Sequence, residues 1–205
     1  MKVLTVHISI IAIIFSVSAC QEKPEQKASQ DQATIEVQSD AKQLMEKGQK
    51  VSTALLESLG PKLKAALKSG GPEHALVICE QLAQPSTYEV SDEFEGLTLS
   101  RVSLKTRNPE NAADELDVEL LKTWEEQLAE GGSVPVSELR YKDEQTPVYY
   151  RPIMTQEVCM KCHGDPSTFS KELTTKLAEL YPDDKATGYR PGQLRGAFRI
   201  EFATK

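Results

Sequence analysis

Apolar residues in the N-terminal half of the chain recur at the spacing of an α-helix. Four of them lie seven, four and four residues apart, intervals that place side chains on one helical face: Leu44, Val51, Leu55 and Leu59. Two glycine–proline clusters are expected to break this pattern, since proline cannot continue a helix but is suited to begin one. The sequence therefore predicts three helices, at residues 39–59, 61–67 and 72–82, the last ending before Pro85.

After Pro85 the apolar runs become shorter and are typical of strands. Four such runs occur, at residues 97–104, 134–141, 147–153 and 193–202, and the middle two are close enough to form a hairpin. Helices are predicted at 114–128, which carries Trp124, and at 170–180. Helices followed by mostly antiparallel strands with helices inserted indicate an α+β fold.

The N-terminus has the composition of an export signal. An apolar run over 3–17 follows Lys2 and is too short for a spanning helix. It ends in Val17-Ser18-Ala19-Cys20, which resembles a bacterial lipobox, so residues 1–19 are predicted to be a lipoprotein signal peptide cleaved before Cys20. The alternative is an ordinary signal peptide that leaves Cys20 unmodified.

Acylation of Cys20 would anchor the protein in a membrane. Gln21, in place of aspartate, indicates the bacterial outer membrane, with the protein on the periplasmic side. Residues 20–37 are rich in Gln, Lys, Glu and Ser, which predicts a disordered tether before a single domain at 38–205. The net charge of −7 argues against nucleic acid as a partner.

The strongest chemical signal is Cys159-Met160-Lys161-Cys162-His163. This C-x-x-C-H motif is typical of c-type haem attachment, in which two thiols bind the haem covalently and the histidine is the proximal iron ligand. A redox dithiol or a zinc site is the alternative. Zinc would need two more ligands, and the chain after the signal offers only His74 and Cys79 besides. We therefore expect one covalent haem c, which also requires export.

The second axial ligand is not downstream, because residues 164–205 contain no Met, His or Cys. His74 and Cys79 share a predicted helix but lie five residues apart, about 140° around it, so only one can face the haem. Cys79 lies on the apolar face of that helix and His74 near its start. An open or different distal site remains an alternative to both.

Several motifs in register resemble a bacterial single c-type haem domain family of uncharacterised function. They are Ala75-Leu76-Val77-Ile78-Cys79, Arg107-Asn108-Pro109-Glu110-Asn111, Arg151-Pro152-Ile153, the haem motif with Gly164-Asp165-Pro166, Ala186-Thr187-Gly188-Tyr189, and Gly192 before Leu194-Arg195-Gly196-Ala197. Family members occur alone or as the sensory half of signalling proteins. The resemblance implies a PAS-like antiparallel sheet with flanking helices, His163 as proximal ligand and Cys79 as distal ligand. One departure is that Trp124 lies later after Asp114 than is usual in the family.

Within the matched motifs, Arg107 and Arg151 are the first candidates to bind the haem propionates, followed by Arg101 and Arg195. A cysteine thiolate would favour ferric iron and leave on reduction, the behaviour of a redox or gas sensor. The partners expected are a membrane, a redox or signalling protein and a diatomic gas. A periplasmic electron carrier is the alternative. A peroxidase-like enzyme is disfavoured, because it requires an open distal site with a general acid–base group.

Overall fold

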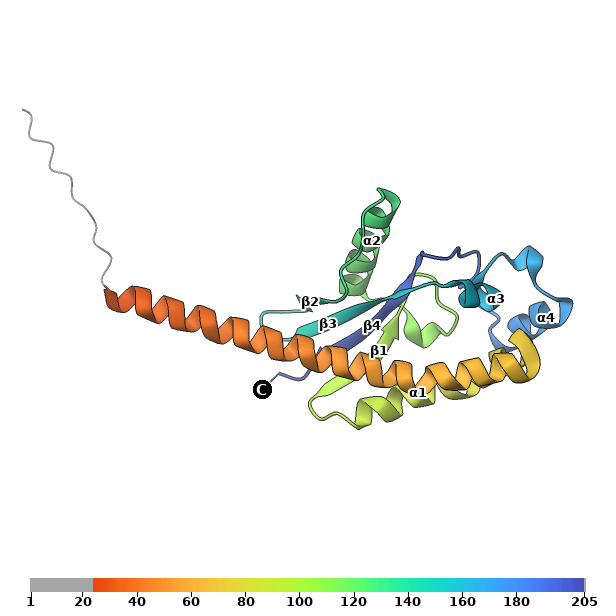
Figure 1. Ribbon diagram of the computed structural model, residues 1–205, viewed down its shortest axis with the longest axis horizontal. Coiled ribbons are helices and arrows are strands. Elements are labelled where there is room, and N and C mark those ends of the chain that lie inside the picture. Colours follow the sequence, from red (N-terminus) through yellow and green to blue (C-terminus); the bar gives the residue numbers. More distant parts are fainter. Residues whose placement is uncertain (1–23, 205) are drawn as a thin grey trace, which may run out of the picture. The chain divides into compact units, whose positions relative to one another are not determined.

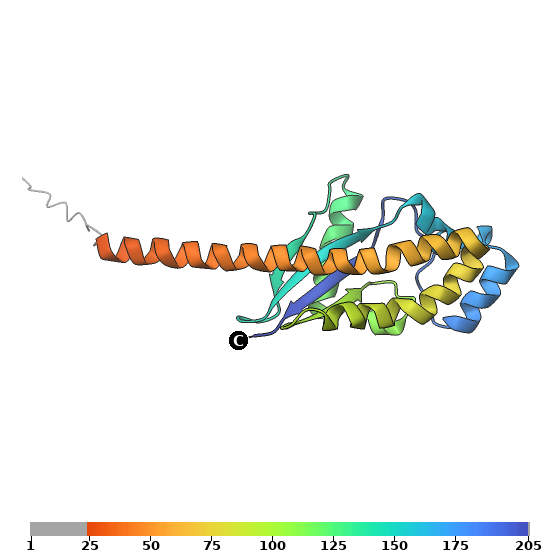
Figure 2. The same ribbon diagram turned by 60° about the horizontal axis from the view of Figure 1, so that its bottom comes forward.

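The computed structural model describes residues 24–204. Its first element, α1 (Pro24–Asp92), leaves helical geometry only at Gly70 and Gly71. Gly71 has φ +69°, a conformation that favours glycine, so the chain reverses there and α1 forms two arms that lie side by side (Figure 1 and Figure 2). The outgoing arm ends before Gly70, and the returning arm begins at Pro72.

Two predicted helix ends are wrong. Pro61 and Pro85 both lie inside α1, so Gly60-Pro61 does not break the helix and the last predicted helix continues to Asp92. A proline removes one backbone hydrogen bond. Burial of apolar side chains on either side of Pro61 outweighs that loss, since Leu55 is 0 % and Ala66 5 % exposed.

The tether prediction also differs from the structure, because residues from Pro24 are helical. Gln, Lys and Glu are well solvated but are also good helix formers, so this composition suits a helix too. Residues from Ser39 to Lys205 form one compact unit, separate from residues up to Gln38. The predicted signal peptide and Cys20 lie outside the described residues. Within residues 24–204, no helix is both long and apolar enough to cross a membrane.

The four predicted strands form one antiparallel sheet in the order β1-β4-β3-β2 (Figure 1). Their bounds are β1 (Leu97–Val102), β2 (Glu138–Tyr141), β3 (Pro147–Met154) and β4 (Leu194–Phe202). The predicted hairpin is confirmed, with Tyr141 opposite Pro147, although residues 134–137 are not part of its first strand.

Each face of the sheet buries its own core. On one face α1 contributes Val51 and Leu55, which pack with Leu99, Tyr149 and Ile200. On the other face α2 (Glu115–Ala129) packs Leu120, Leu121 and Trp124 against Val148 and Tyr150. Alternation of side chains along each strand supplies both cores. The helices and strands together confirm the α+β fold class.

The remaining helices follow β3. The short α3 (Met160–His163) is preceded by the 3₁₀ turn η2 (Glu157–Cys159), and α4 (Lys171–Leu180) is preceded by η3 (Pro166–Thr168). A further turn, η1 (Pro109–Asn111), lies between β1 and α2. Leu173 and Leu177 of α4 pack with Leu76 on the returning arm of α1, so α4 is fixed against that arm.

Candidate functional site

A cavity of about 550 Å³ lies between the two arms of α1, the ends of β1, β3 and β4, and α3. Its volume falls within the range of about 300–1,000 Å³ that is usual for cofactor pockets. Most of its lining is apolar and comes from both arms of α1 and from the sheet, including Leu55, Leu59, Leu67, Leu76, Leu82 and Phe198. Three further lining residues are exposed, Leu56 at 42 %, Leu63 at 37 % and Val158 at 43 %. The site is therefore suited to a large, mostly apolar ligand.

Cys159, Cys162 and His163 all line this cavity. They lie on η2 and α3, a single short helical segment that ends at Gly164. A Cβ atom at Gly164 would lie 2.6 Å from the carbonyl oxygen of Met160, so glycine allows the chain to leave the helix directly after His163. Both cysteines are free thiols. The predicted motif thus presents two thiols and an imidazole to one space.

The His163 ring is held by a backbone carbonyl. Its Nδ1 lies 2.6 Å from the oxygen of Ala186, and because a carbonyl can only accept, the proton of the neutral ring is on Nδ1. Burial lowers the pKa of His163 to about 3, with further lowering by Arg107 and Arg195. The neutral ring therefore keeps Nε2 free as a metal ligand.

Cys79 lines the same cavity from the returning arm of α1. Burial raises the pKa of its thiol, while Arg107 and Arg101 act in the opposite direction. His74 is exposed and does not line the cavity. Of the two upstream candidates on this helix, Cys79 therefore shares the cavity with His163, and His74 lies outside it.

Three of the four candidate arginines line the cavity, namely Arg101, Arg107 and Arg195. Arg151 does not: its Nη1 donates to the hydroxyls of Ser52 and Thr53 at 3.3 and 3.0 Å. Of the candidate arginines, Arg101 therefore lies at the cavity and Arg151 elsewhere on the sheet. Arg101 follows Leu97 and Leu99 at two-residue intervals on β1, and this alternation was the signal that could have identified it.

The guanidinium groups of Arg101 and Arg107 have unsatisfied donors. Among the described residues, the buried Nε atoms of both lack a hydrogen-bond partner. Burial lowers the pKa of Arg101, as expected for a cation removed from water. A buried cation without its full set of partners is costly, so these donors favour an anionic group in the cavity. The two carboxylates of a haem match this requirement.

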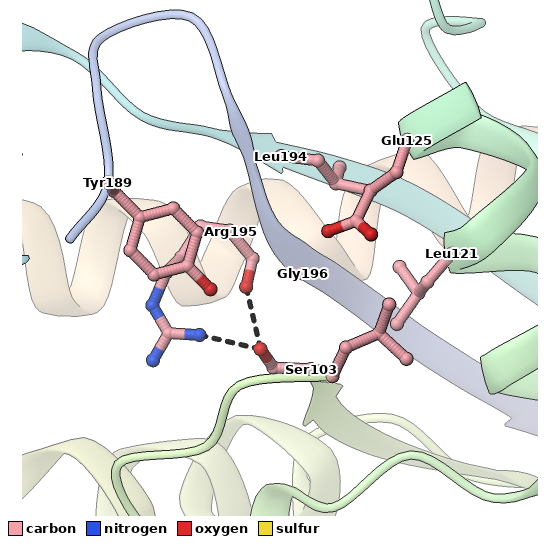
Figure 3. A pocket seen from close by; sticks show the side chains of 8 residues that line it. Ser103, Leu121, Glu125, Tyr189, Leu194, Arg195 and Gly196 are labelled. Atoms are coloured by element: carbon pink, nitrogen blue, oxygen red, sulfur yellow. Dashed lines mark hydrogen bonds between the residues drawn. The ribbon is translucent and has the colours of Figure 1, made fainter. Parts of the chain in front are cut away.

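Arg195, the third arginine that lines the cavity, is held by Ser103. Its Nη1 donates to the hydroxyl of Ser103 at 2.7 Å, and that hydroxyl donates to the carbonyl of Arg195 at 2.8 Å (Figure 3). The guanidinium also lies 5.5 Å from the ring of Tyr189, a residue that borders a small hollow beside Gly196. Arg195 is thus fixed by protein groups, unlike the Nε atoms of Arg101 and Arg107.

Comparison with known proteins gave two matches. A family model described as Tll0287-like matches residues 30–203. Among solved structures, the crystal structure of the cyanobacterial heme-protein Tll0287 superposes with a TM-score of 0.55 at 22 % identity, and the match covers 89 % of this chain and 97 % of that chain. A search of curated proteins gave no match. The structural likeness confirms the PAS-like fold expected from the motifs.

Proposed function

The chain belongs to the Tll0287-like family, and from that membership we propose that it binds one covalent haem c in the cavity between α1 and the sheet. The observation that supports this most directly is the convergence of Cys159, Cys162, His163 and Cys79 on one apolar cavity. The thiols of Cys159 and Cys162 would form the thioether bonds. The two residues left, an imidazole and a thiol from separate elements, would be a suitable pair of ligands for the iron.

His163 would bind iron through Nε2, because Nδ1 already donates to Ala186. Cys79 would be the second residue to hold the iron, as a thiolate. Burial favours the neutral thiol of Cys79, so the positive charge of the iron would have to remove its proton. His74, the alternative ligand, is exposed and would have to move to reach the cavity.

The haem propionates would accept hydrogen bonds from Arg101 and Arg107. Both residues line the cavity and have buried Nε donors without a partner among the described residues. Arg151 has less support for this role, because it does not line the cavity and its Nη1 donates to Ser52 and Thr53. Charge-assisted bonds to a carboxylate are stronger than neutral ones, so two such contacts would fix the orientation of the ring.

We propose a redox or gas sensor as the physiological role. Bound haem supplies an iron that changes by one electron and can accept a small gas. Cys79 lies on the α1 hairpin, whereas His163 lies on α3, so loss of the Cys79 ligand on reduction would free a helix arm from the site. A partner protein would then receive the signal. A lipid anchor at Cys20 would hold the protein at the outer membrane, facing the periplasm.

An electron carrier is the second candidate. The exposed apolar side chains at the cavity mouth, Leu56, Leu63 and Val158, would surround an accessible haem edge, which electron transfer requires. Coordination in a carrier would stay the same in both oxidation states. A peroxidase-like role has less support, because Cys79 as an iron ligand would take the position that a general acid–base residue needs.

The test is to express the full chain with haem-attachment machinery and record optical and EPR spectra of the oxidised and reduced protein. Low-spin thiolate signals are expected, and Cys79→Ala should abolish them while His74→Ala leaves them unchanged. Haem that remains covalently bound after replacement of both Cys159 and Cys162 by alanine would overturn the attachment. Binding of carbon monoxide by the reduced protein would support the sensor, and unchanged coordination on reduction would support the carrier.

A further inference from the structure

The loop that holds the His163 ring is itself fixed by a neighbouring segment. This anchoring loop, residues 184–189, contains Ala186, whose carbonyl lies 2.6 Å from Nδ1 of His163. The position of that carbonyl determines the orientation of the imidazole and the strength of its Nδ1–H bond. In haem proteins such a bond controls how strongly a histidine donates to iron.

Residues 105–107, which follow β1, bind the anchoring loop at three successive points. The ammonium group of Lys105 donates to the carbonyl of Thr187 at 2.6 Å. The carbonyl of Thr106 accepts from the backbone N–H of Lys185 at 2.9 Å. Nη2 of Arg107 donates to Oδ2 of Asp184 at 2.9 Å. Each residue of this segment thus contributes at least one bond to the loop.

The loop also pairs with the haem motif. The backbone N–H of Gly188 donates to the carbonyl of Gly164 at 2.8 Å, and that of Tyr189 donates to the carbonyl of His163 at 2.9 Å. The loop is therefore fixed on both sides of Ala186.

Arg107 contacts both the haem motif and the anchoring loop. The same Nη2 that pairs with Asp184 donates to the carbonyl of Cys162 at 2.7 Å and approaches the carbonyl of Ala186 at 3.5 Å. The other oxygen of Asp184 accepts from the backbone N–H of Ala186 at 2.8 Å. The Arg107 and Asp184 side chains are only 11 % and 9 % exposed, so solvent screens this pair weakly.

We propose that Arg107 and Asp184 are positioning residues for the proximal ligand: as a pair they hold the Ala186 carbonyl where it orients the His163 ring and strengthens its donation to iron. This role rests on the proposed haem binding. It is separate from contact with a propionate, because it uses Nη2 of Arg107 whereas the unpartnered donor is Nε. It also gives a reason for the buried Arg107–Asp184 pair beside His163, since the carbonyl of Ala186 would be enough to accept the Nδ1–H bond.

The decisive variant is Arg107→Lys, which keeps the positive charge but has one nitrogen in place of a planar fork. Asp184→Asn is the second variant, since it weakens the pair from the other side. The readouts are the reduction potential and the ferric low-spin EPR g-values of the haem-loaded full chain. A weaker Nδ1–H bond stabilises ferric iron less, so the potential should rise in both variants. The g-values should shift as the ring turns.

Arg151→Lys is the matched control, because it changes a part-buried arginine that does not line the cavity. It should leave both readouts at their wild-type values. Unchanged potential and g-values in Arg107→Lys, in protein that carries haem, would overturn the positioning role. Should Arg107→Lys fail to fold, an unchanged potential and unchanged g-values in Asp184→Asn would overturn the positioning role. Failure of the wild-type chain to bind haem would instead contradict the proposed function, so the two failures are distinguishable.

Discussion

The hydroxyl group of Tyr150 donates a 2.6 Å hydrogen bond to Oδ1 of Asp117, which joins β3 to α2 on the face of the sheet opposite to α1. The same oxygen accepts from Nε of Arg199 at 3.0 Å, and Asp117 is only 2 % exposed. Burial raises the pKa of Asp117, and burial together with Asp117 raises the pKa of Tyr150. The three side chains therefore form one buried polar cluster in which each depends on the others.

Asp117→Ala should lower the free energy of unfolding by about 3 kcal/mol, because it leaves Tyr150 without its acceptor and Arg199 without its most buried one. Urea denaturation of wild type and variant would measure the loss. Lys42→Ala is the control, since Lys42 and Glu46 form an exposed pair at 3.9 Å, expected to contribute less than about 0.5 kcal/mol. Equal stability of Asp117→Ala and wild type would contradict the importance of the cluster.

Gly48 packs directly on the ring of Tyr149. A Cβ atom at this position would lie 2.3 Å from Cγ of the ring, closer than the buried tyrosine allows. Gly48→Ala should therefore destabilise the protein by about 1–3 kcal/mol, even though alanine is the better helix former. Thermal or urea denaturation would show the change.

Gly60→Ala provides the opposite case on the same helix. Apart from its chain neighbours, a Cβ atom there would meet nothing within 4 Å. Gly60 precedes Pro61, whose ring disfavours helical backbone for a preceding residue with a Cβ, so the gain from helix propensity should be partly offset and stay below about 1 kcal/mol. The two substitutions are chemically identical, and an equal effect at both positions would show that contact with Tyr149 is unimportant.

The strands and the C-x-x-C-H motif could be found in the sequence because their signals are local. Short apolar runs predicted all four strands, and the C-x-x-C-H motif singled out Cys159, Cys162 and His163, which line one cavity in the structure. The ends of α1 were wrong because burial around Pro61 overrides the local effect of proline, and no short-range pattern reports that packing. Ala186 and Asp184 could not be predicted as supports of His163, since a backbone acceptor leaves no signature in the sequence.

Pro61→Ala should stabilise the protein, by up to about 3 kcal/mol, because Pro61 lies inside α1 and costs it one backbone hydrogen bond. Pro72→Ala is the matched control. Pro72 begins the returning arm directly after the non-helical Gly71, a position where the missing N–H costs little, so its replacement should have an effect near zero. Urea midpoints for the two variants would separate them, and a loss of stability in Pro61→Ala would contradict an uninterrupted outgoing arm.

Glu73 couples stability to pH in the acid range. A 2.5 Å hydrogen bond from the hydroxyl of Ser170 is the main cause that lowers the pKa of Glu73 below its ordinary value of 4.5. A lowered pKa in the folded state adds stability above pH 4.5, and this contribution is lost as the pH falls through the folded value. The pair is near the surface, so its contribution should be less than about 1 kcal/mol.

Glu73→Gln should therefore be less stable than wild type at pH 7, and the difference should shrink near pH 3. Urea denaturation at both pH values would measure it. Glu57→Gln, an exposed position on the same helix, is the control and should show no such difference. A stability gap between Glu73→Gln and wild type that stays constant from pH 7 to pH 3 would show that ionised Glu73 adds no stability through Ser170.

Arg101 is expected to have opposite effects on the haem-free and haem-loaded protein. Its Nη2 donates to Gln84 at 3.1 Å, but its buried Nε has no partner among the described residues. Arg101→Met removes a cation that is incompletely paired when the cavity holds no anion, so the haem-free variant should be more stable by about 1–3 kcal/mol. In the haem-loaded protein the same change removes a positive charge beside Cys79. Loss of that charge makes ferric iron more stable relative to ferrous iron, so the reduction potential should fall. Denaturation of haem-free protein and redox titration of haem-loaded protein measure the two effects separately. A variant that is less stable without haem and unchanged in potential would show that Arg101 supports the fold alone and does not contact a propionate.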